Sequence, residues 1–195
     1  ALFERCFNAG LNNPSERPSL CEWAEAFEVA TGHCDQCESC GSTFFYTSKL
    51  DCPFCDHTQD KNRTILLQEY RYMPPDLIRE GLPEDIPESL IQKECWTRTG
   101  KAMVLSMSPA ELKAFPLGAS LYADAPSLCT IELAKDGLWI EPSAGIQVSL
   151  QRASDDKVVS VVRRQRLKSD SRSGASFWLH LGEVEEEHVV WRFNW

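Results

Sequence analysis

The chain has 195 residues, of which 43% are hydrophobic and 25% are charged, and its net charge is −9. These proportions are typical of a soluble globular protein, and no apolar run approaches the roughly 20 residues that a membrane span needs. The acidic balance argues against nucleic-acid binding, because a phosphate backbone repels it. Nine cysteines without a signal-peptide pattern predict a reducing, cytoplasmic location.

The first 32 residues predict two short amphipathic helices. Apolar residues fall on one helical face over 2–9, and Gly10 is expected to end that helix. The second helix is expected to begin after Ser19, which forms a capping-box pattern with Glu22, and to end at Gly32. Neither helix can bury its apolar stripe alone, so both are expected to dock on something larger.

Two C-x2-C knuckles follow the helices, and they predict a tetrahedral thiolate site for structural zinc. The predicted ligands are Cys37, Cys40, Cys52 and Cys55. Each knuckle turns two sulfurs towards one point, and a hairpin between the knuckles brings the pairs together.

Two alternatives to this ligand set remain open from the sequence. Cys34 lies three residues before Cys37 and is the alternate ligand of the first knuckle. We prefer Cys40 as the partner of Cys37 because Gly41 follows it, and a residue free to adopt positive φ lets backbone N–H groups point at the sulfurs. The second alternative is a disulfide cluster, which is typical of secreted chains with paired cysteines throughout.

The residues Leu2 to Phe27, LFERCFNAGLNNPSERPSLCEWAEAF, resemble the last two helices of a protein-kinase C-lobe, with Arg17-Pro18 at the usual place in the loop. In that family the arginine pairs with a glutamate that ends the activation segment, and no Ala-Pro-Glu stretch precedes Arg17 here. Followed by a four-cysteine ribbon, the segment looks like the bacterial serine/threonine kinases associated with tellurite-resistance (Ter) operons. Those kinases carry a zinc ribbon and a β-rich module after the catalytic domain.

The chemistry of a kinase is missing from this sequence. It has no Gly-rich GxGxxG loop, no VAIK-type lysine, no HRD catalytic loop and no DFG metal ligand. Nothing would therefore hold ATP–Mg²⁺ or position a hydroxyl group. We expect no enzymatic activity, so the resemblance implies a regulatory part of a kinase.

Period-two patterns dominate the rest of the chain and predict an antiparallel β-sandwich or barrel. The expected strands are 64–72, 102–107, 128–133, 138–141, 146–150, 157–162, 176–181 and 188–193. A Pro-rich acidic segment after the first of these predicts a linker with one helical turn at 76–80. The residues 108–114, SPAELKA, predict a helix capped by Ser108 and Glu111.

Three other features of the sequence are candidate binding sites. The basic run 162–172 holds Arg163, Arg164, Arg166, Lys168 and Arg172. It either binds a phosphorylated peptide or forms a solvated strand end, and it lacks the Ser-x-x-His loop of forkhead-associated domains. His180 and His188 are expected to face outwards or to be hydrogen-bonded rather than to bind metal. Trp195 is interpreted as packing or as an exposed anchor for a partner.

The predicted fold class is α+β, with a short helical hairpin and a zinc ribbon before an antiparallel β-sandwich-like domain. The expected divisions are 1–32, 33–60 and 61–195. The expected function is a non-catalytic, zinc-binding regulatory and protein-interaction module of a bacterial stress-response kinase. Its expected partners are the parent kinase domain and other proteins, phosphorylated or not, with no membrane. The alternatives are a zinc-ribbon nucleic-acid adaptor and an enzyme that uses zinc as a Lewis acid, which needs an open coordination position.

Overall fold

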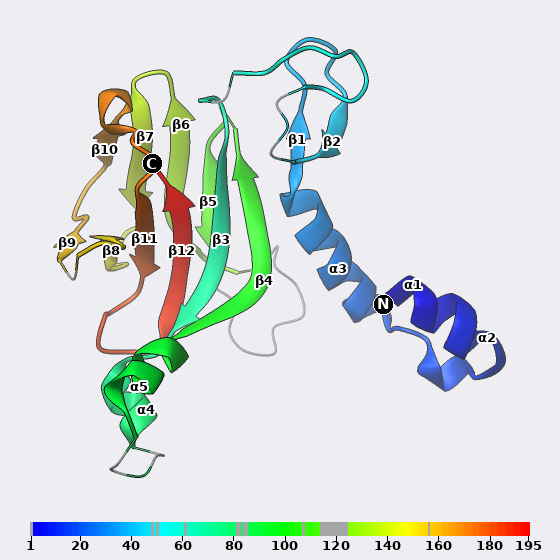
Figure 1. Ribbon diagram of the computed structural model, residues 1–195, viewed down its shortest axis with the longest axis horizontal. Coiled ribbons are helices and arrows are strands. Elements are labelled where there is room, and N and C mark those ends of the chain that lie inside the picture. The colour runs from blue at the N-terminus through cyan, green and yellow to red at the C-terminus, as the bar shows by residue number, and fades with distance from the viewer. Residues whose placement is uncertain are drawn as a thin grey trace.

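The computed structural model describes residues 2–47, 49, 51–60, 62–80, 83, 86–106, 108–113, 125–155 and 157–195. Short helices and antiparallel sheets make up the chain, which confirms the predicted α+β class. Figure 1 shows two parts: the N-terminal helices and a small hairpin on one side, and a larger β structure on the other.

The N-terminal helices form a pair, as predicted. The first is continuous over 2–12 and consists of α1 (Leu2–Glu4), a π-helical stretch (Arg5–Ala9) and α2 (Gly10–Asn12). The prediction that Gly10 ends this helix is wrong, because its backbone is helical. Gly10 instead allows close approach: a Cβ atom there would lie 2.5 Å from Arg17 Cγ, and Arg17 Nε donates to Gly10 O at 2.8 Å.

A single turn of 3-10 helix (Pro14–Glu16) leads to α3 (Leu20–Gly32). The predicted capping box is present: the Ser19 hydroxyl accepts from Glu22 N–H, and the Glu22 carboxylate accepts from Ser19 N–H. The C-terminal end of α3 contacts β4 closely, since a Cβ atom at Gly32 would lie 2.4 Å from Ala102 O. Glycine is therefore required where the helix meets the sheet.

The ribbon follows α3 directly. Its first hairpin pairs β1 (Cys34–Gln36) with β2 (Thr43–Phe45) in antiparallel register. A single antiparallel bridge between Asp51 and Thr58 closes the second knuckle. Thus each knuckle is the tip of a short hairpin.

Two antiparallel sheets form the β-rich part. The six-stranded sheet has the order β4-β3-β12-β11-β8-β9, and the four-stranded sheet has the order β10-β7-β6-β5. In the larger sheet the bounds are Ile65–Tyr72 (β3), Trp96–Leu105 (β4), Val148–Arg152 (β8), Val158–Ser160 (β9), Ser176–Leu181 (β11) and His188–Asn194 (β12). In the smaller sheet they are Ala110–Lys113 (β5), Ser127–Ala134 (β6), Gly137–Pro142 (β7) and Gln165–Lys168 (β10). Every expected strand overlaps one of these; Met107 and Asp156 lie outside the described residues.

One buried apolar cluster fills the space between the sheets, as the sandwich prediction requires. The larger sheet contributes alternate residues such as Leu67, Leu179 and Trp191, and the smaller sheet contributes Ile131 and Ile140. The period-two pattern of the sequence is thus the pattern of side chains that point into this shared core.

The predicted helix at 108–114 is wrong. Ala110–Lys113 is strand β5, which pairs with β6 and buries Leu112 completely. The capping-box pattern at Ser108 is a local signal, and pairing with β6 outweighs it over so few residues. Ala114 lies outside the described residues.

Between β3 and β4 the sequence predicted a linker with one helical turn. That turn is α4 (Pro75–Arg79), and a second helix, α5 (Glu88–Glu94), was not predicted. The helix α5 begins after Pro87 and buries Ile91, so this segment is packed at the end of the sheet (Figure 1). The division into 1–32, 33–60 and 61–195 stays a prediction.

Candidate metal centre

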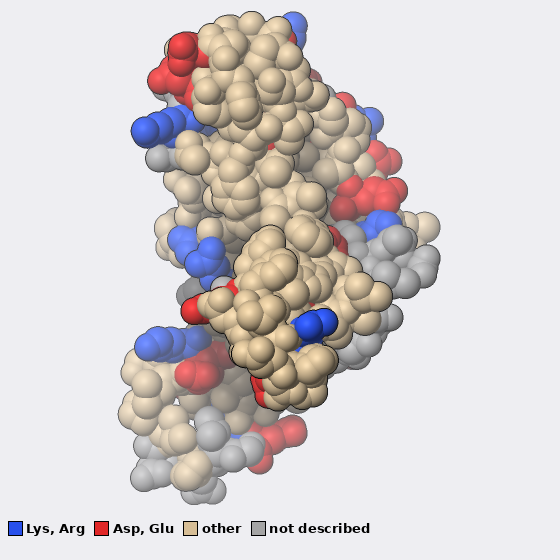
Figure 2. Space-filling model, turned by 90° about the vertical axis from the view of Figure 1, so that its right-hand side faces the viewer, with Lys and Arg blue, Asp and Glu red and all other residues tan. Residues whose placement is uncertain are grey.

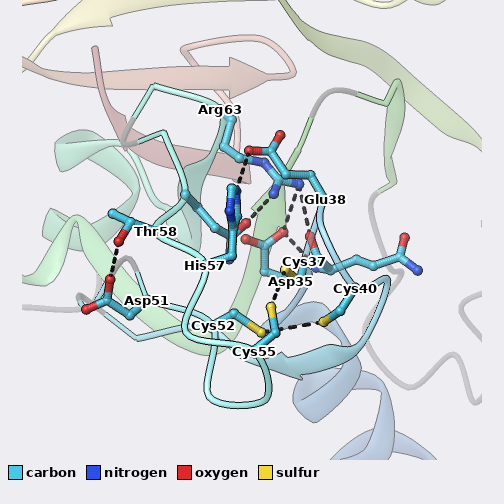
Figure 3. A network of polar contacts seen from close by, with 12 residues as sticks. Asp35, Cys37, Glu38, Cys40, Asp51, Cys52, Cys55, His57, Thr58 and Arg63 are labelled. Atoms are coloured by element: carbon cyan, nitrogen blue, oxygen red, sulfur yellow. Dashed lines mark hydrogen bonds and ion pairs between the residues drawn. The ribbon is translucent and has the colours of Figure 1, made fainter.

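The four predicted cysteines come together at the tips of the two knuckles (Figure 3). Their Sγ atoms all lie within 4.8 Å of one another, with 3.7 Å between Cys37 and Cys55 and 3.8 Å between Cys40 and Cys52. A tetrahedral zinc ion with Zn–S bonds of about 2.3 Å separates its sulfur ligands by about 3.8 Å. The two shorter distances match this spacing, so the four thiols are compatible with a four-coordinate thiolate site.

The same backbone turn builds both knuckles. In the first, Gly41 N–H donates to Cys37 O at 2.9 Å, and Gly41 has a φ of +72°. In the second, Asp56 N–H donates to Cys52 O at 3.0 Å, and Asp56 has a φ of +56°. The positive φ expected for Gly41 is therefore present in the first knuckle. In the second, aspartate takes the left-handed conformation that it tolerates better than most residues.

The electrostatics of the four thiols favour a bound cation. Hydrogen bonds from the side chain and backbone of Ser42 lower the pKa of Cys40 to about 6. The backbone hydrogen bond from His57 lowers the pKa of Cys55. Desolvation and hydrogen bonds with the neighbouring thiols outweigh that bond and raise the pKa of Cys55 to about 12. Crowded thiols cannot all ionise without a positive charge among them, and a divalent ion supplies that charge.

Cys34 lies outside this cluster. It is the first residue of β1, and its thiol donates to Ala30 O at 3.5 Å. Cys37 and Cys52, the first cysteine of each knuckle, are buried, whereas Cys40 and Cys55 are exposed. The disulfide alternative finds no support, because all nine cysteines are free.

Polar contacts around the sulfurs tie the two knuckles together. Glu38 of the first knuckle contacts His57 Nε2 of the second at 3.2 Å (Figure 3). Arg63, which follows the ribbon, donates to Gln36 O at 3.0 Å and lies 3.8 Å from the buried Asp35 carboxylate. Arg63 also donates to the Gln59 side chain. The sequence carried no signal that Arg63 links these segments, because its partners are up to 28 residues away.

The basic run is largely occupied by contacts within the sandwich. Arg164 forms an ion pair with Glu132 at 2.8 Å, and its guanidinium stacks 4.7 Å from the Trp139 ring centroid. Arg166 pairs with Asp136 and lies over the same ring. Residues 165–168 form β10, so the interpretation of this run as a strand end and loop understates its structure.

The histidines of β11 and β12 form a buried pair. His180 Nδ1 and His188 Nε2 are 2.8 Å apart, and His188 Nδ1 contacts Glu186 O at 2.7 Å. The expected hydrogen bonds are present, and both rings lie on the face of the sheet away from the sandwich core, where Tyr72 packs against them and buries them from solvent. Trp195 is also buried, and its Nε1 donates to Ser171 Oγ at 3.1 Å, so its interpretation as an exposed anchor is wrong.

Comparisons with protein-family models, with curated proteins and with solved structures give no match for this chain. The family resemblance rests on sequence motifs alone. Among the described residues, no helix has the length and apolar character to span a lipid bilayer.

Proposed function

We propose that this chain is a non-catalytic regulatory and protein-interaction module whose ribbon is built on structural zinc. The observation that carries the proposal is the all-cysteine set with every Sγ within 4.8 Å of the others. Four thiolates complete a tetrahedral shell and leave no open position for a substrate or an activated water, which is the mark of a structural site. A zinc site of this kind contributes about 10–16 kcal/mol to folding, comparable to the whole stability of a small domain.

The N-terminal helices supply the interaction surface in this proposal. Large apolar side chains along the pair are exposed, and they are Phe3, Phe7, Leu11, Leu20 and Phe27. Leu20 is 87% exposed, and Figure 2 shows that this side of the molecule carries a broad area with few charged side chains. Several exposed apolar side chains on one pair of helices are typical of a protein-binding site. They support docking of the pair onto a larger helical layer.

We infer that this layer is a kinase catalytic domain, as the resemblance to the end of a C-lobe implies. Arg17 supports the inference: its guanidinium donates to Gly10 O, and no carboxylate of the described residues pairs with it. An ion pair with the glutamate that ends a kinase activation segment would use the remaining N–H groups of Arg17. On this proposal the parent chain is a bacterial stress-response serine/threonine kinase in the reducing cytoplasm, and catalysis resides in its kinase domain.

The nucleic-acid alternative loses its main support in this fold. It required a basic face over residues 163–172, and two arginines there form ion pairs with acidic side chains of β6 and of the β6–β7 turn. With these two charges paired and a net charge of −9 over the whole chain, the run offers less positive charge for counterion release.

Metal analysis tests the zinc proposal. We expect one zinc ion per chain in the wild type and in Cys21→Ser, which alters an exposed cysteine outside the cluster. Cys40→Ser should lose the metal, and a chelator should unfold residues 2–60 of the wild type, seen as lost amide protection. Absence of zinc from the wild type, or thermal unfolding that a chelator leaves unchanged, contradicts the proposal.

Binding to a kinase catalytic domain tests the proposed docking through the N-terminal helices. Leu20→Asp places a charge on the exposed apolar side of the helix pair without touching the core, so it should abolish binding while zinc content stays at one per chain. Val162→Asp, a change at an 86% exposed position on the sandwich, is the matched control and should bind as the wild type does. Equal binding by both variants would refute docking through the helices.

A further inference from the structure

A cavity of about 620 Å³ lies where the ribbon meets the outer face of the six-stranded sheet. One wall consists of Tyr46 and Thr47, which follow β2 of the ribbon. The opposite wall is formed by β3 and β12, and the arginines Arg172 and Arg192 both line the cavity. This cavity is separate from the four-cysteine cluster, because none of those cysteines lines it.

Arg172 is held rigidly at this junction. Its Nη1 donates to Asn62 O at 2.7 Å, its Nη2 donates to Thr64 O at 3.0 Å, and the guanidinium lies 5.2 Å from the Trp195 ring centroid. A guanidinium has five N–H donors, so these two bonds leave three for another partner. Burial lowers the pKa of Arg172, and the neighbouring Asp60 and Tyr46 offset part of this effect.

Arg192 is oriented by a second set of contacts. Its guanidinium lies 5.2 Å from the Trp178 ring centroid, and its Nη2 is 3.4 Å from Ser176 Oγ. The Ser176 hydroxyl donates in turn to Asn194 Oδ1 at 2.7 Å. Because that oxygen is engaged, the amide NH₂ of Asn194 is left as a donor at the cavity wall.

The charge balance of the cavity is unusual for so acidic a protein. No aspartate or glutamate is among its described lining residues, and within the described chain neither Arg172 nor Arg192 takes part in an ion pair. Asp60 lines an adjoining cavity beyond Arg172 and raises the pKa of that arginine in part. The surrounding side chains Thr47, Thr64 and Gln68 add hydroxyl and amide donors.

We propose that this cavity binds a phosphate group through Arg172 and Arg192. Two guanidinium groups match the double negative charge of a phosphate dianion, and their forked donors suit its oxygens better than an ammonium would. Both guanidinium groups lie over an indole ring, and Arg172 also contacts two carbonyl oxygens while Arg192 contacts the Ser176 hydroxyl. These contacts hold both forks in place before the ligand arrives, which lowers the entropic cost of binding. The cavity exceeds a single phosphate ion in size, so a phosphorylated side chain can enter with part of its peptide.

The test is an NMR titration of the full chain with inorganic phosphate at constant ionic strength. We expect saturable shifts of the backbone amides of Thr64 and Gln68. Arg192→Gln should weaken binding at least about tenfold, since it removes charge-assisted hydrogen bonds. Arg192 belongs to no core cluster, so this variant should keep the wild-type fold, with spectral changes confined to residues near the cavity. Arg172→Lys, which retains the charge but loses the fork, should also weaken binding.

Arg163→Gln is the matched control, because it removes the same charge from an exposed residue outside the cavity. It should change the affinity by less than about twofold. Equal weakening by Arg163→Gln and Arg192→Gln, absence of saturable shifts, or acetate bound as tightly as phosphate would overturn the proposal. A phosphoserine peptide that binds more tightly than inorganic phosphate assigns the site to a phosphorylated protein. Equal or weaker peptide binding assigns it to the free ion, and zinc content reports on the metal proposal independently.

Discussion

The buried histidine pair should make the sandwich sensitive to mild acid. His180 is almost fully buried, and burial, together with the neighbouring His188, lowers its pKa from 6.5 to about 4. Rings of Tyr72 and Trp96 pack against it, and Gln151 Oε1 lies 3.1 Å from its Nε2. Replacing His180 with glutamine removes this titration and keeps hydrogen-bonding groups in the site.

The sign of the effect follows from which state takes up the proton. Between pH 6.5 and about 4 the unfolded chain protonates this histidine while the folded chain does not. The free energy of unfolding therefore falls as the pH falls through this range. Above pH 6.5 His180 is mainly neutral in both states, so the folded protein keeps its full stability. For this shift, the loss between pH 7 and pH 4.5 is about 2 kcal/mol.

Urea unfolding at several pH values measures this loss. For each protein we take the change in unfolding free energy between pH 7 and pH 4.5, and we subtract the change in His180→Gln from the change in the wild type. The subtraction removes the effect of metal release from the ribbon, because that release occurs in both proteins. A wild-type loss that matches the loss in His180→Gln would refute the reasoning.

Three further predictions concern packing and ligand choice. Gly32→Ala should lower the unfolding free energy by about 1–3 kcal/mol, measured in urea, because its Cβ would meet Ala102 O at 2.4 Å. Trp195→Phe should cost about 1–3 kcal/mol by leaving Lys168 O without the indole donor, and Trp195→Ala about 3–5 kcal/mol in the same assay. Cys34→Ser should retain one zinc per chain by elemental analysis, since its thiol lies outside the cluster; lost zinc would make Cys34 a ligand.

The sequence predicted best those features that depend on near neighbours in the chain. The thiol cluster was predictable because a C-x2-C knuckle fixes its own turn, and the α3 cap because Ser19 and Glu22 are three residues apart. Strands such as β11 and β12 were predictable because their alternate residues point into the core between the sheets.

The sequence could not predict features that depend on distant partners. Leu112 lies in a strand because β6 is available to pair with it, and the local pattern around Ser108 favoured a helix. Arg166 meets Asp136, 30 positions away in the chain, so a charge that looks free in the sequence is paired in the fold. The two arginines of the proposed phosphate cavity share no motif either, because the cavity exists only once the ribbon has docked on β3 and β12.

The strand order of the larger sheet also constrains when the protein can fold. The last strand in the chain, β12, pairs with β3 on one side and β11 on the other, and so it occupies the middle of the sheet. During synthesis, β3 and β11 therefore wait with open edges until residues 188–194 have left the ribosome. Contacts as distant in sequence as Arg71 with Glu187 slow folding, and open edges invite pairing with other chains. The ribbon, whose contacts are local, is free to bind metal and fold long before that closing step.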